Sequence, residues 1–593
     1  MDAETGETTK LEKLPPHPLR RVALVIGAIG VALIALSAIA SGATPLPIAA
    51  GVFAIVFALW IARTGEAVQI VNRALRAITE GRNDEARAWL DLGEKRFRSP
   101  YVLRVVDLHR AAMAWNEGDL VTARARLESA LRRRLTLTHR FYQRLHVGTA
   151  HGLLSMVLAA AGDEAGSERE ISMLRASDDA PPDALARAEI AHAIVLLRRG
   201  DRDALGHHLD GDAALLIENA PPRERAIVRA YRRMLRTSST SVYRRPVPRD
   251  VESSARTKMT DWLARVAPDA AAHAERVLPD GTSSAIESTD RELDPEAVRA
   301  VAASRAAKQA AVTGGRKKTP SVRKVLILWA VLIAMFVSVW QIISDGPRGP
   351  APTPPPTTSG PSLWSICCAV FFAVFGVLFF VQLRRAWQRQ RTTLQARIAA
   401  ARGKFDEAER LYRSVTEGKG VLGAHGFLGL ALIAERRGNV ADALMLCDLG
   451  IAKVSSGLQR AAASDLLLPE LIAERAFVLA ALDRNAEADV ELASLRKEFP
   501  AYPLLARSDL RVRLLSRVRA GDLAGAAELA RGRSPEMPLF MRDELLGDAA
   551  IASLDTSDSA EEERARVRDE VHATRDVEAW IQAVAPRALA ALR

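Results

Sequence analysis

Histidine and cysteine are common metal ligands in proteins, but their spacing in this chain does not favour a metal site. The chain has 11 His and 3 Cys. His207 and His208 are adjacent, so on a helix their side chains would point about 100° apart and could not readily share one ion. His146 and His151 lie five residues apart, which is also a poor ligand spacing. Two of the cysteines are adjacent within an apolar run. We therefore expect no metal site.

Sequence signatures of catalysis and cofactor binding are also missing from the sequence. There is no GxxxxGK[ST] segment, and no GxGxxG opening a helix, to cradle a phosphate, and there is no HExxH or CxxC segment to bind zinc. No pair of carboxylates stands apart from the polar faces of amphipathic helices. We therefore expect a non-catalytic protein without a cofactor. An enzyme with an unrecognised helical active site is an alternative.

Basic residues are the remaining candidates for binding, because the net charge is +11. They cluster in LRRRLTLTHRFYQR (Leu131–Arg144), YRRMLR (Tyr231–Arg236) and RRAWQRQR (Arg384–Arg391). The third cluster directly follows an apolar run, where anionic lipid would attract it. The first two have no aromatic stacking platform or recognised binding module around them, so they are predicted to be solvated helix faces. Contact with a lipid bilayer is expected, and nucleic-acid binding is not.

The composition favours helices as the elements that hold these residues. Ala and Arg have high helix propensity and are heavily used, whereas aromatic residues make up only 5% of the 593 residues. The length is sufficient for about three to five domains. The sequence therefore predicts an all-α fold.

Four apolar runs without a charge are the most prominent segments. Each is roughly 20 residues long, which is the length that a helix needs to cross a hydrocarbon core. The runs form two close pairs, which predicts two transmembrane hairpins, at 22–62 and 325–383. A buried core helix is the alternative for each run, and a cleaved signal peptide is a further alternative for the first. The runs are Val22–Ala40, Leu46–Ala62, Val325–Ile343 and Leu363–Leu383.

Lysine and arginine flank both hairpins on the side away from their connecting loops. The positive-inside rule then places the loops outside and the rest of the chain in the cytoplasm. The N-terminal tail 1–21, the regions after each hairpin and both termini would be cytoplasmic, as in a multi-pass protein of a bacterial inner membrane. The second loop, 344–362, is rich in proline and is predicted to be an extended spacer, with a polyproline ligand site as the alternative. The flanking cations include Lys10, Lys13, Arg20, Arg21, Arg63, Arg73, Arg76, Arg316, Lys317, Lys318, Arg323, Lys324, Arg384, Arg385, Arg389 and Arg391.

A ten-residue pattern recurs after each hairpin, with glycine first, alanine five positions later and an apolar residue four positions after that. Glycine can adopt the left-handed conformation that ends a helix, and small residues let two helices pack closely. A small residue also precedes the turn by seven positions in seven of eight copies. The pattern therefore predicts eight helical hairpins. Their turn residues are Gly81, Gly118, Gly162, Gly200, Gly403, Gly438, Asp483 and Gly521.

The copy GKFDEAERLY resembles the tetratricopeptide repeat (TPR). It supplies Gly403, Ala408 and Tyr412 in the order of the TPR pattern, preceded by the small Ala396. The resemblance implies an α-solenoid with a groove that binds segments of partner proteins. The Trp and Pro typical of TPRs are mostly missing, and the turns within each set are 35 to 45 positions apart instead of about 34. The predicted units are therefore degenerate and TPR-like. An ordinary irregular helical domain is the alternative.

The segment WLARVAP (Trp262–Pro268) returns near the end of the chain as WIQAVAP (Trp580–Pro586), at an offset of 318 in the numbering. Corresponding turns of the two sets of repeats are offset by 320 to 322. This predicts a tandem duplication in which each copy has a membrane hairpin, four repeats and a closing Trp-containing helix that covers the last repeat. The predicted TPR-like solenoid domains are 63–276 and 384–593, and 277–324 is a predicted disordered tether between them.

We therefore expect a membrane-anchored protein-interaction scaffold with four transmembrane helices and two cytoplasmic solenoids. A subunit of a membrane transport or envelope-assembly complex is the main alternative. Cations outnumber anions along the predicted concave faces, so the unidentified partner is expected to carry acidic side chains or a free carboxylate. Solvated helix faces are the other interpretation of these positions. The predicted partner-binding residues are Arg73, Arg76, Arg110, Asn116, Gln395, Arg397, Glu435 and Arg436.

Overall fold

The chain folds into helices joined by turns and loops. The computed structural model describes residues 18–39, 45–133, 140–211, 213–237, 261–268, 381, 384–455, 457–534, 536–557, 560–574 and 576–592. None of these residues lies in a β-strand. The prediction of an all-α fold is therefore confirmed for the part of the chain that the structure describes.

The first half contains the membrane-hairpin candidate and the first set of repeats. A short helical segment at 261–266 contains Trp262. The other helices are α1 (Pro18–Ile39), α2 (Pro45–Thr79), α3 (Asn83–Arg96), α4 (Pro100–Glu117), α5 (Leu120–Arg132), α6 (Arg140–Ala161), α7 (Glu164–Arg175), α8 (Pro182–Arg198), α9 (Arg202–Asp210), α10 (Ala213–Ile217) and α11 (Pro222–Thr237).

In the second half, helices joined by turns follow one another as they do in the first half after its hairpin. It begins with a helix over 384–401. The helices after it are α17 (Phe405–Thr416), α18 (Gly420–Arg436), α19 (Val440–Lys453), α20 (Gly457–Ala463), α21 (Leu467–Ala481), α22 (Asn485–Glu498), α23 (Leu505–Ala520), α24 (Leu523–Arg531), α25 (Met541–Ser553), α26 (Ala560–Ala573), α27 (Val577–Val584) and α28 (Pro586–Ala591).

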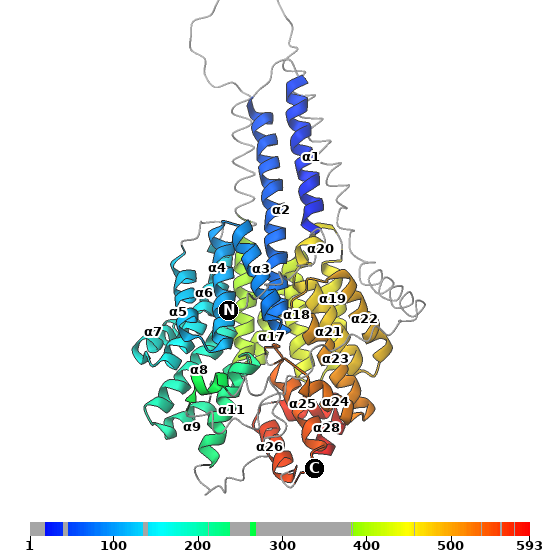
Figure 1. Cartoon of the computed structure of the whole chain (residues 1–593). Helices are drawn as coiled ribbons and strands as arrows, with labels where there is room; N and C mark the ends of the chain where they lie inside the picture. Colours follow the sequence, from blue (N-terminus) through cyan, green and yellow to red (C-terminus); the bar gives the residue numbers. More distant parts are fainter. Residues whose placement is uncertain are drawn as a thin grey trace, which may run out of the picture.

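Helices α1 and α2 form an antiparallel pair that projects from the helical head (Figure 1). The pair packs closely at two glycines, since a Cβ on Gly30 would lie 2.7 Å from the carbonyl oxygen of Gly51. The 35-residue α2 continues into the head, where it is the first helix of the first repeat. Exposed large apolar side chains on the projecting pair are Leu24, Val25, Val31, Ile48, Val52, Val56, Phe57, Leu59 and Trp60.

One helical segment among the described residues, Ala54–Thr79, is long and apolar enough to cross a membrane. It overlaps the second predicted span. Within the first predicted span the apolar helical stretch is shorter, Val22–Ala32. The third predicted span lies outside the described residues, and so does the fourth apart from Val381. Four spans therefore stay a prediction.

The eight predicted turn residues all adopt the left-handed conformation, with φ between 61° at Asp483 and 87° at Gly162. At Gly118 the turn is closed by two backbone hydrogen bonds, from Gly118 N–H to the carbonyl of Trp115 (3.0 Å) and from Asp119 N–H to that of Ala114 (2.8 Å). Bonds of this kind satisfy carbonyls at a helix end. The predicted turn conformation is confirmed, even at the one turn that lacks glycine.

The predicted packing positions are buried where the two helices of each unit cross. Exposure of the residue seven positions before the turn is 0% in seven units and 2% at Leu514. Exposure of the residue five positions after the turn is 0% in all eight units. The two sets are Ala74, Ala111, Ser155, Ala193, Ala396, Ala431, Ala476 and Leu514, and Ala86, Ala123, Ser167, Leu205, Ala408, Ala443, Ala488 and Ala526.

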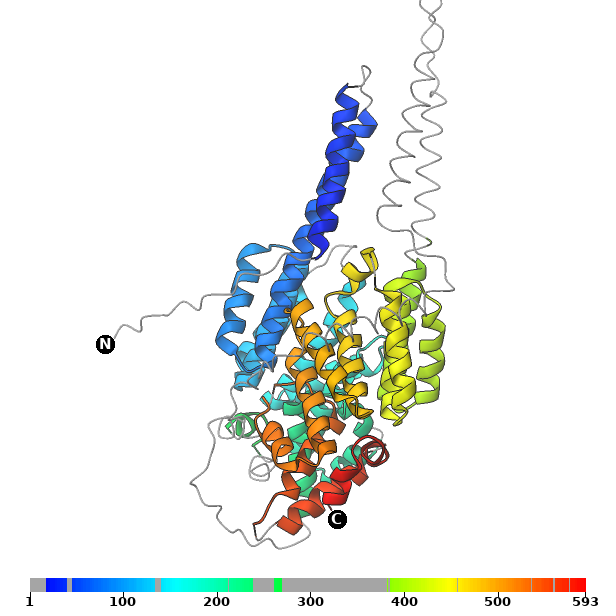
Figure 2. The same cartoon turned by 90° about the vertical axis from the view of Figure 1, so that its right-hand side faces the viewer.

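The two halves pack against each other, while the predicted tether 277–324 lies outside the described residues. Figure 2 shows the helix over 384–401 and the lower part of α2 on opposite sides of the head, beginning at a similar height. Ile398 of the second half is buried within the apolar core of the first half. The two halves therefore share a packed boundary.

Candidate functional site

The second half's closing helix, α27, holds Trp580 against the second repeat of that half. The indole N–H of Trp580 donates a 2.8 Å hydrogen bond to the carboxylate of Glu435, in the last turn of α18. The ring stacks on Phe477, with 6.3 Å between ring centroids. Arg542 of α25 lies 5.6 Å from the centroid of the Trp580 ring and donates to Glu435 over 3.1 Å. Glu435 is fully buried, so these bonds satisfy a carboxylate that water cannot reach.

The first half repeats this arrangement. Trp262 donates a 2.7 Å hydrogen bond to the backbone carbonyl of Trp115, and the two rings meet edge to face at 88°. Arg223 of α11 lies 5.1 Å from the centroid of the Trp262 ring and donates to the carbonyl of Asn116. We call each arrangement a Trp clasp. Equivalent clasp residues, 318 to 320 positions apart, are Trp115 and Glu435, Arg223 and Arg542, and Trp262 and Trp580.

The closing helix therefore reaches further than a cap on the last repeat. Helix α27 packs on α25 and α26 beyond the fourth repeat, but also on α18. A Cβ on the turn residue Gly438 would lie only 2.6 Å from Ala583 of α27. Contact with the second repeat is not part of the expectation that this helix covers the last repeat. Tryptophan has an apolar body and one N–H donor, so it fits best where apolar surface and an acceptor meet, and the end of the second repeat provides both.

Helices α11 and α25 bring opposite charges together between the halves. Arg225 lies 3.0 Å from Glu544, and Arg229 lies 3.1 Å from the same carboxylate and 3.5 Å from Asp548. Arg225, Arg229 and Glu544 are buried. The separation is 319 residues for Arg225 and Glu544, and again for Arg229 and Asp548. Each arginine thus contacts the residue at its own equivalent position, as residues near a two-fold axis do.

Further from α11 and α25, each half supplies a carboxylate to the other, although the two arginines that bind these carboxylates are not at equivalent positions. Arg223 of the first half forms an ion pair with Glu536 of the second. In the other direction, Arg436 of the second half lies 2.9 Å from Glu218 of the first. Glu218 and Glu536 are themselves at equivalent positions of the two halves, because their offset equals that of Trp262 and Trp580. The same two loops, one from each half, therefore supply a carboxylate to an arginine of the opposite half.

At each outer edge of the interface, an arginine of one half contacts a loop of the other half. Arg76, on the first helix of the first half, donates a 2.6 Å hydrogen bond to the carbonyl of Pro500, in the loop before α23. Arg391, on the first helix of the second half, lies 3.3 Å from Asp179, in the loop before α8. We use the term pseudo-two-fold interface for these contacts together with those of α11 and α25.

Because these ion pairs are buried, each charged side chain needs its partner to offset the cost of removing it from water. Burial lowers the pKa of Arg225, against the opposing effect of Glu544. Burial acts in the same direction on Arg229, but Glu570, Glu544 and Asp548 outweigh it and leave the pKa of Arg229 raised. Removing one member of a buried pair leaves an uncompensated charge, which costs about 3–5 kcal/mol. The interface is therefore sensitive to single charge changes.

The residues predicted to bind a partner through the first half are engaged within the chain. Arg73 is only 7% exposed. Arg76 contacts Pro500, as described, and Glu80 at 2.7 Å. Arg110 forms ion pairs with carboxylates of α3 at 2.5 and 2.7 Å. Asn116 accepts from Arg223 in the first clasp. The structure does not bring the four together on one open surface.

The second-half candidates divide into enclosed and accessible residues. Glu435 is buried in its clasp, and Arg436 is bound to Glu218 across the interface. Gln395 is half-buried and Arg397 is exposed. The expectation that all eight residues line an open concave face is wrong at Glu435, because the closing helix and α25 fill that space. Partner binding at these positions stays a prediction.

Further enclosed charges lie behind the second clasp. Arg511 of α23 lies 2.7 Å from Asp543 of α25 and 3.0 Å from Glu474 of α21. Its guanidinium is 4.0 Å from the centroid of the Phe477 ring and 3.7 Å from Glu435. Burial raises the pKa of both Glu474 and Asp543, while Arg511 opposes the rise. The network joins α18, α21, α23 and α25 around one arginine.

Arg223, Arg225, Arg229 and Glu544 are not among the residues predicted from the sequence. In the sequence, PRERAIVRA of α11 and MRDELLGDA of α25 each read as an ordinary amphipathic helix, whose charged residues would be assigned to its solvated face. One signal in the sequence could have revealed them. Arg225 and Arg229 correspond, at an offset of 319, to the oppositely charged Glu544 and Asp548.

No known protein-family model matches the chain, and no curated protein matches its sequence. Within the described ranges, no group of three or more His, Cys, Asp and Glu side chains could hold a metal ion. Instead, His208 lies 2.9 Å from the carbonyl of Glu189, and its ring meets that of His192 edge to face.

Proposed function

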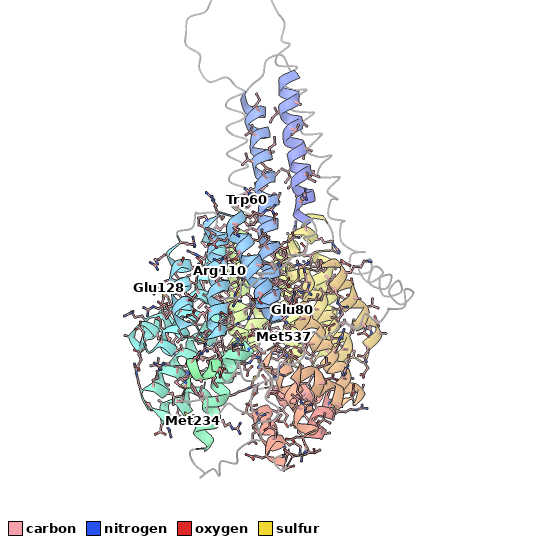
Figure 3. All side chains as sticks on the ribbon, viewed as in Figure 1. Trp60, Glu80, Arg110, Glu128, Met234 and Met537 are labelled. Atoms are coloured by element: carbon pink, nitrogen blue, oxygen red, sulfur yellow. The ribbon has the colours of Figure 1, made fainter. Side chains whose placement is uncertain are left out.

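We propose that this chain is a membrane-anchored scaffold whose two helical-repeat halves act as one rigid platform for a protein partner. The observation that supports this proposal is that the single helix α2 belongs both to the projecting pair and to the packed head. Its first part belongs to a projecting pair with many exposed apolar side chains, and its second part is the first helix of a packed repeat. Figure 3 places Trp60 where the pair meets the head and Glu80 well inside the head.

In this proposal the two halves are a tandem duplication of degenerate TPR-like units. The left-handed turns and the buried small residues at the helix crossings support this interpretation. So do the two Trp clasps and the contacts between equivalent positions of α11 and α25. The buried charged residues described above connect helices to one another, which is consistent with a structural role as a scaffold.

The proposed topology has four spans, with both termini and both halves in the cytoplasm of a bacterial-type inner membrane. The apolar pair α1 and α2 carries no charge between Arg21 and Arg63. Both arginines lie at the end of the pair nearest the head. Cations next to a span favour the cytoplasmic side, which supports a cytoplasmic head in this proposal.

The partner surface in this proposal is the outer side of the head. The Trp clasps and the interface occupy much of the predicted concave faces. Arg397 is the one predicted residue that is exposed, and it lies on the helix over 384–401. An acidic segment of the partner would bind there through charge-assisted hydrogen bonds.

Site-specific photo-crosslinking in native membranes tests the scaffold directly. A photoreactive amino acid at Arg397 should give one discrete crosslinked protein partner, and the same amino acid at the buried Ala431 should give none. Arg397→Glu, with the photoreactive amino acid moved to the neighbouring Gln395, should abolish the product. A product pattern identical at all three positions, or release of the protein from membranes by alkaline washing, would contradict the proposal.

A further inference from the structure

Two arginines lie at the base of the projecting pair, at the same height. In the packing of α1 against α2, Gly30 faces Gly51. Because the helices are antiparallel, the same register places Arg20 of α1 level with Arg63 of α2. Both arginines are exposed. They mark the membrane-proximal end of the head.

The end of α3 adds further cations at this level. Arg96, the last residue of α3, lies 2.6 Å from Glu66, which is less than one turn after Arg63 in α2. Its neighbours Lys95 and Arg98 are exposed. The loop after α3 therefore lies just beneath the base of the hairpin.

The second half presents the same chemistry at its own first helix. Arg384 and Arg385 are exposed at the start of the helix over 384–401. Arg384 precedes the turn at Gly403 by almost the same interval as Arg63 precedes the turn at Gly81. Figure 2 shows the part of α2 that enters the head and the helix over 384–401 at a similar height, on opposite sides of the head. We call the exposed cations at this level the basic collar: Arg20, Arg63, Lys95, Arg98, Arg384 and Arg385.

A tryptophan accompanies the collar in each half. Trp60 is 52% exposed and lies three residues before Arg63. Trp387 is 49% exposed and lies three residues after Arg384. Tryptophan favours the level of lipid headgroups, where its ring is partly in apolar surroundings and its N–H can reach a polar group. Exposed tryptophan and arginine at one height are therefore typical of a membrane–water interface.

We infer that the basic collar binds the phosphate groups of anionic phospholipids, an inference that rests on the proposed membrane anchoring. Guanidinium groups bind phosphate with two parallel hydrogen bonds. Cations at the ends of helices also compensate the helix dipole, which would explain Lys95 without any lipid. That explanation fails for Arg20, in the first turn of α1, where the dipole disfavours a cation, and for Arg63, within α2. Lipid phosphate accounts for all of these positions.

Binding of soluble short-chain lipids to the full-length protein in detergent tests this inference. Native mass spectrometry should show more bound phosphatidylglycerol than phosphatidylcholine, and added salt should reduce the difference. The variant Arg63→Gln/Arg384→Gln/Arg385→Gln should bind phosphatidylglycerol about fivefold more weakly for each arginine removed, at low salt. The matched control is Arg202→Gln/Arg402→Gln/Lys404→Gln, which removes three exposed cations away from the collar and should keep the wild-type preference.

Three outcomes would overturn the inference. They are equal binding of the two lipids, an equal loss in the two triple variants, and displacement of phosphatidylglycerol by an equal concentration of inorganic phosphate. Membrane anchoring is measured separately, as resistance of each variant to alkaline extraction. A collar variant that resists extraction and yet binds phosphatidylglycerol as the wild type does contradicts the collar alone. Extraction of the wild-type protein contradicts the anchoring.

Discussion

Trp580 and Glu435 are 145 residues apart in the chain, yet the indole N–H of Trp580 donates a 2.8 Å hydrogen bond to the Glu435 carboxylate. This bond ties the end of the second half to its second repeat. The equivalent bond in the first half, from Trp262, spans 147 residues. The stability of each half should therefore depend on a residue near its end.

Trp580→Phe should reduce the free energy of unfolding by about 1–3 kcal/mol, because the aromatic contact with Phe477 remains while Glu435 loses a buried donor. Trp580→Ala should cost more, about 3–5 kcal/mol, since it also leaves a cavity. The exposed Trp387→Ala is the control and should have no measurable effect. Denaturant unfolding followed by circular dichroism measures all three. Equal stabilities of Trp580→Ala and Trp387→Ala would contradict the clasp.

Gly200→Ala should destabilise the protein by about 1–2 kcal/mol through backbone strain alone. Gly200 has a φ of 76°, and no atom lies within 4 Å of the position that an added methyl group would take, so there is no clash to add. Gly206→Ala, six residues later within α9, should instead stabilise by about 0.5–1 kcal/mol, because its nearest neighbour is 4.0 Å away and its backbone is helical. Shifts in melting temperature of the same sign for the two variants would refute this account of the turns.

Ala408→Phe should cost about 1–3 kcal/mol by overpacking the helix crossing of the first repeat in the second half, where Ala408 is 0% exposed. Ala441→Phe is the matched control, because Ala441 is exposed on α19 two residues from the buried Ala443. The two melting temperatures should differ, and coincident values would exclude the predicted packing.

Acid should destabilise the protein through two histidines held neutral in the fold. Burial, with a smaller contribution from Arg397, lowers the pKa of His425 to about 4. Burial and His146 lower the pKa of His109 to about 4 as well. Unfolded histidine has a pKa of about 6.5, so the unfolded chain gains protons first as the pH falls. The stability contributed by the neutral histidines is fully present above about pH 6.5 and is lost towards pH 4.

His109→Gln/His425→Gln should therefore lose less stability than the wild type between pH 6.5 and pH 4. Denaturant midpoints at a series of pH values measure the difference. Parallel curves for variant and wild type would show that these histidines are not responsible for acid sensitivity.

The turns and helix crossings could be predicted from the sequence because each hairpin carries its own local signal. Gly403, Ala408 and Ala396 lie within a short stretch, and a left-handed turn between two closely packed helices requires residues of these types. The offset between the two sets of repeats likewise follows from the sequence alone.

The interface between the halves could not be predicted in the same way. Arg225 and Glu544 each lie on a helix with ordinary polar residues, and no local pattern distinguishes a buried ion pair from a solvated charge. The prediction that Glu435 lines a groove is wrong for this reason. Its burial depends on Trp580 and Arg542, which come from helices more than 100 positions away in the chain.

A double-mutant cycle on Arg229 and Glu544 should give a coupling energy of about 1.5–3 kcal/mol, because the two side chains are buried 3.1 Å apart. The variants are Arg229→Met, Glu544→Gln and their combination. A cycle on Arg124 and Glu128, an exposed pair within α5, should give only about 0.3–0.5 kcal/mol. Similar coupling energies in the two cycles would contradict a buried ionic contact between the halves.

Contacts between α11 and α25 should hold the two halves together as one body even when the chain between them is cut. The most direct measurement introduces a protease site into the tether 277–324 of the full-length protein and follows the cleaved fragments by size-exclusion chromatography in detergent. We expect the wild-type fragments to co-elute and Arg225→Glu/Arg229→Glu to separate them. Adding Glu544→Arg/Asp548→Arg should restore co-elution by reversing both sides. Separation of the wild-type fragments would contradict the single body, and co-elution of the Arg225→Glu/Arg229→Glu fragments would show that the contacts between α11 and α25 do not hold it together.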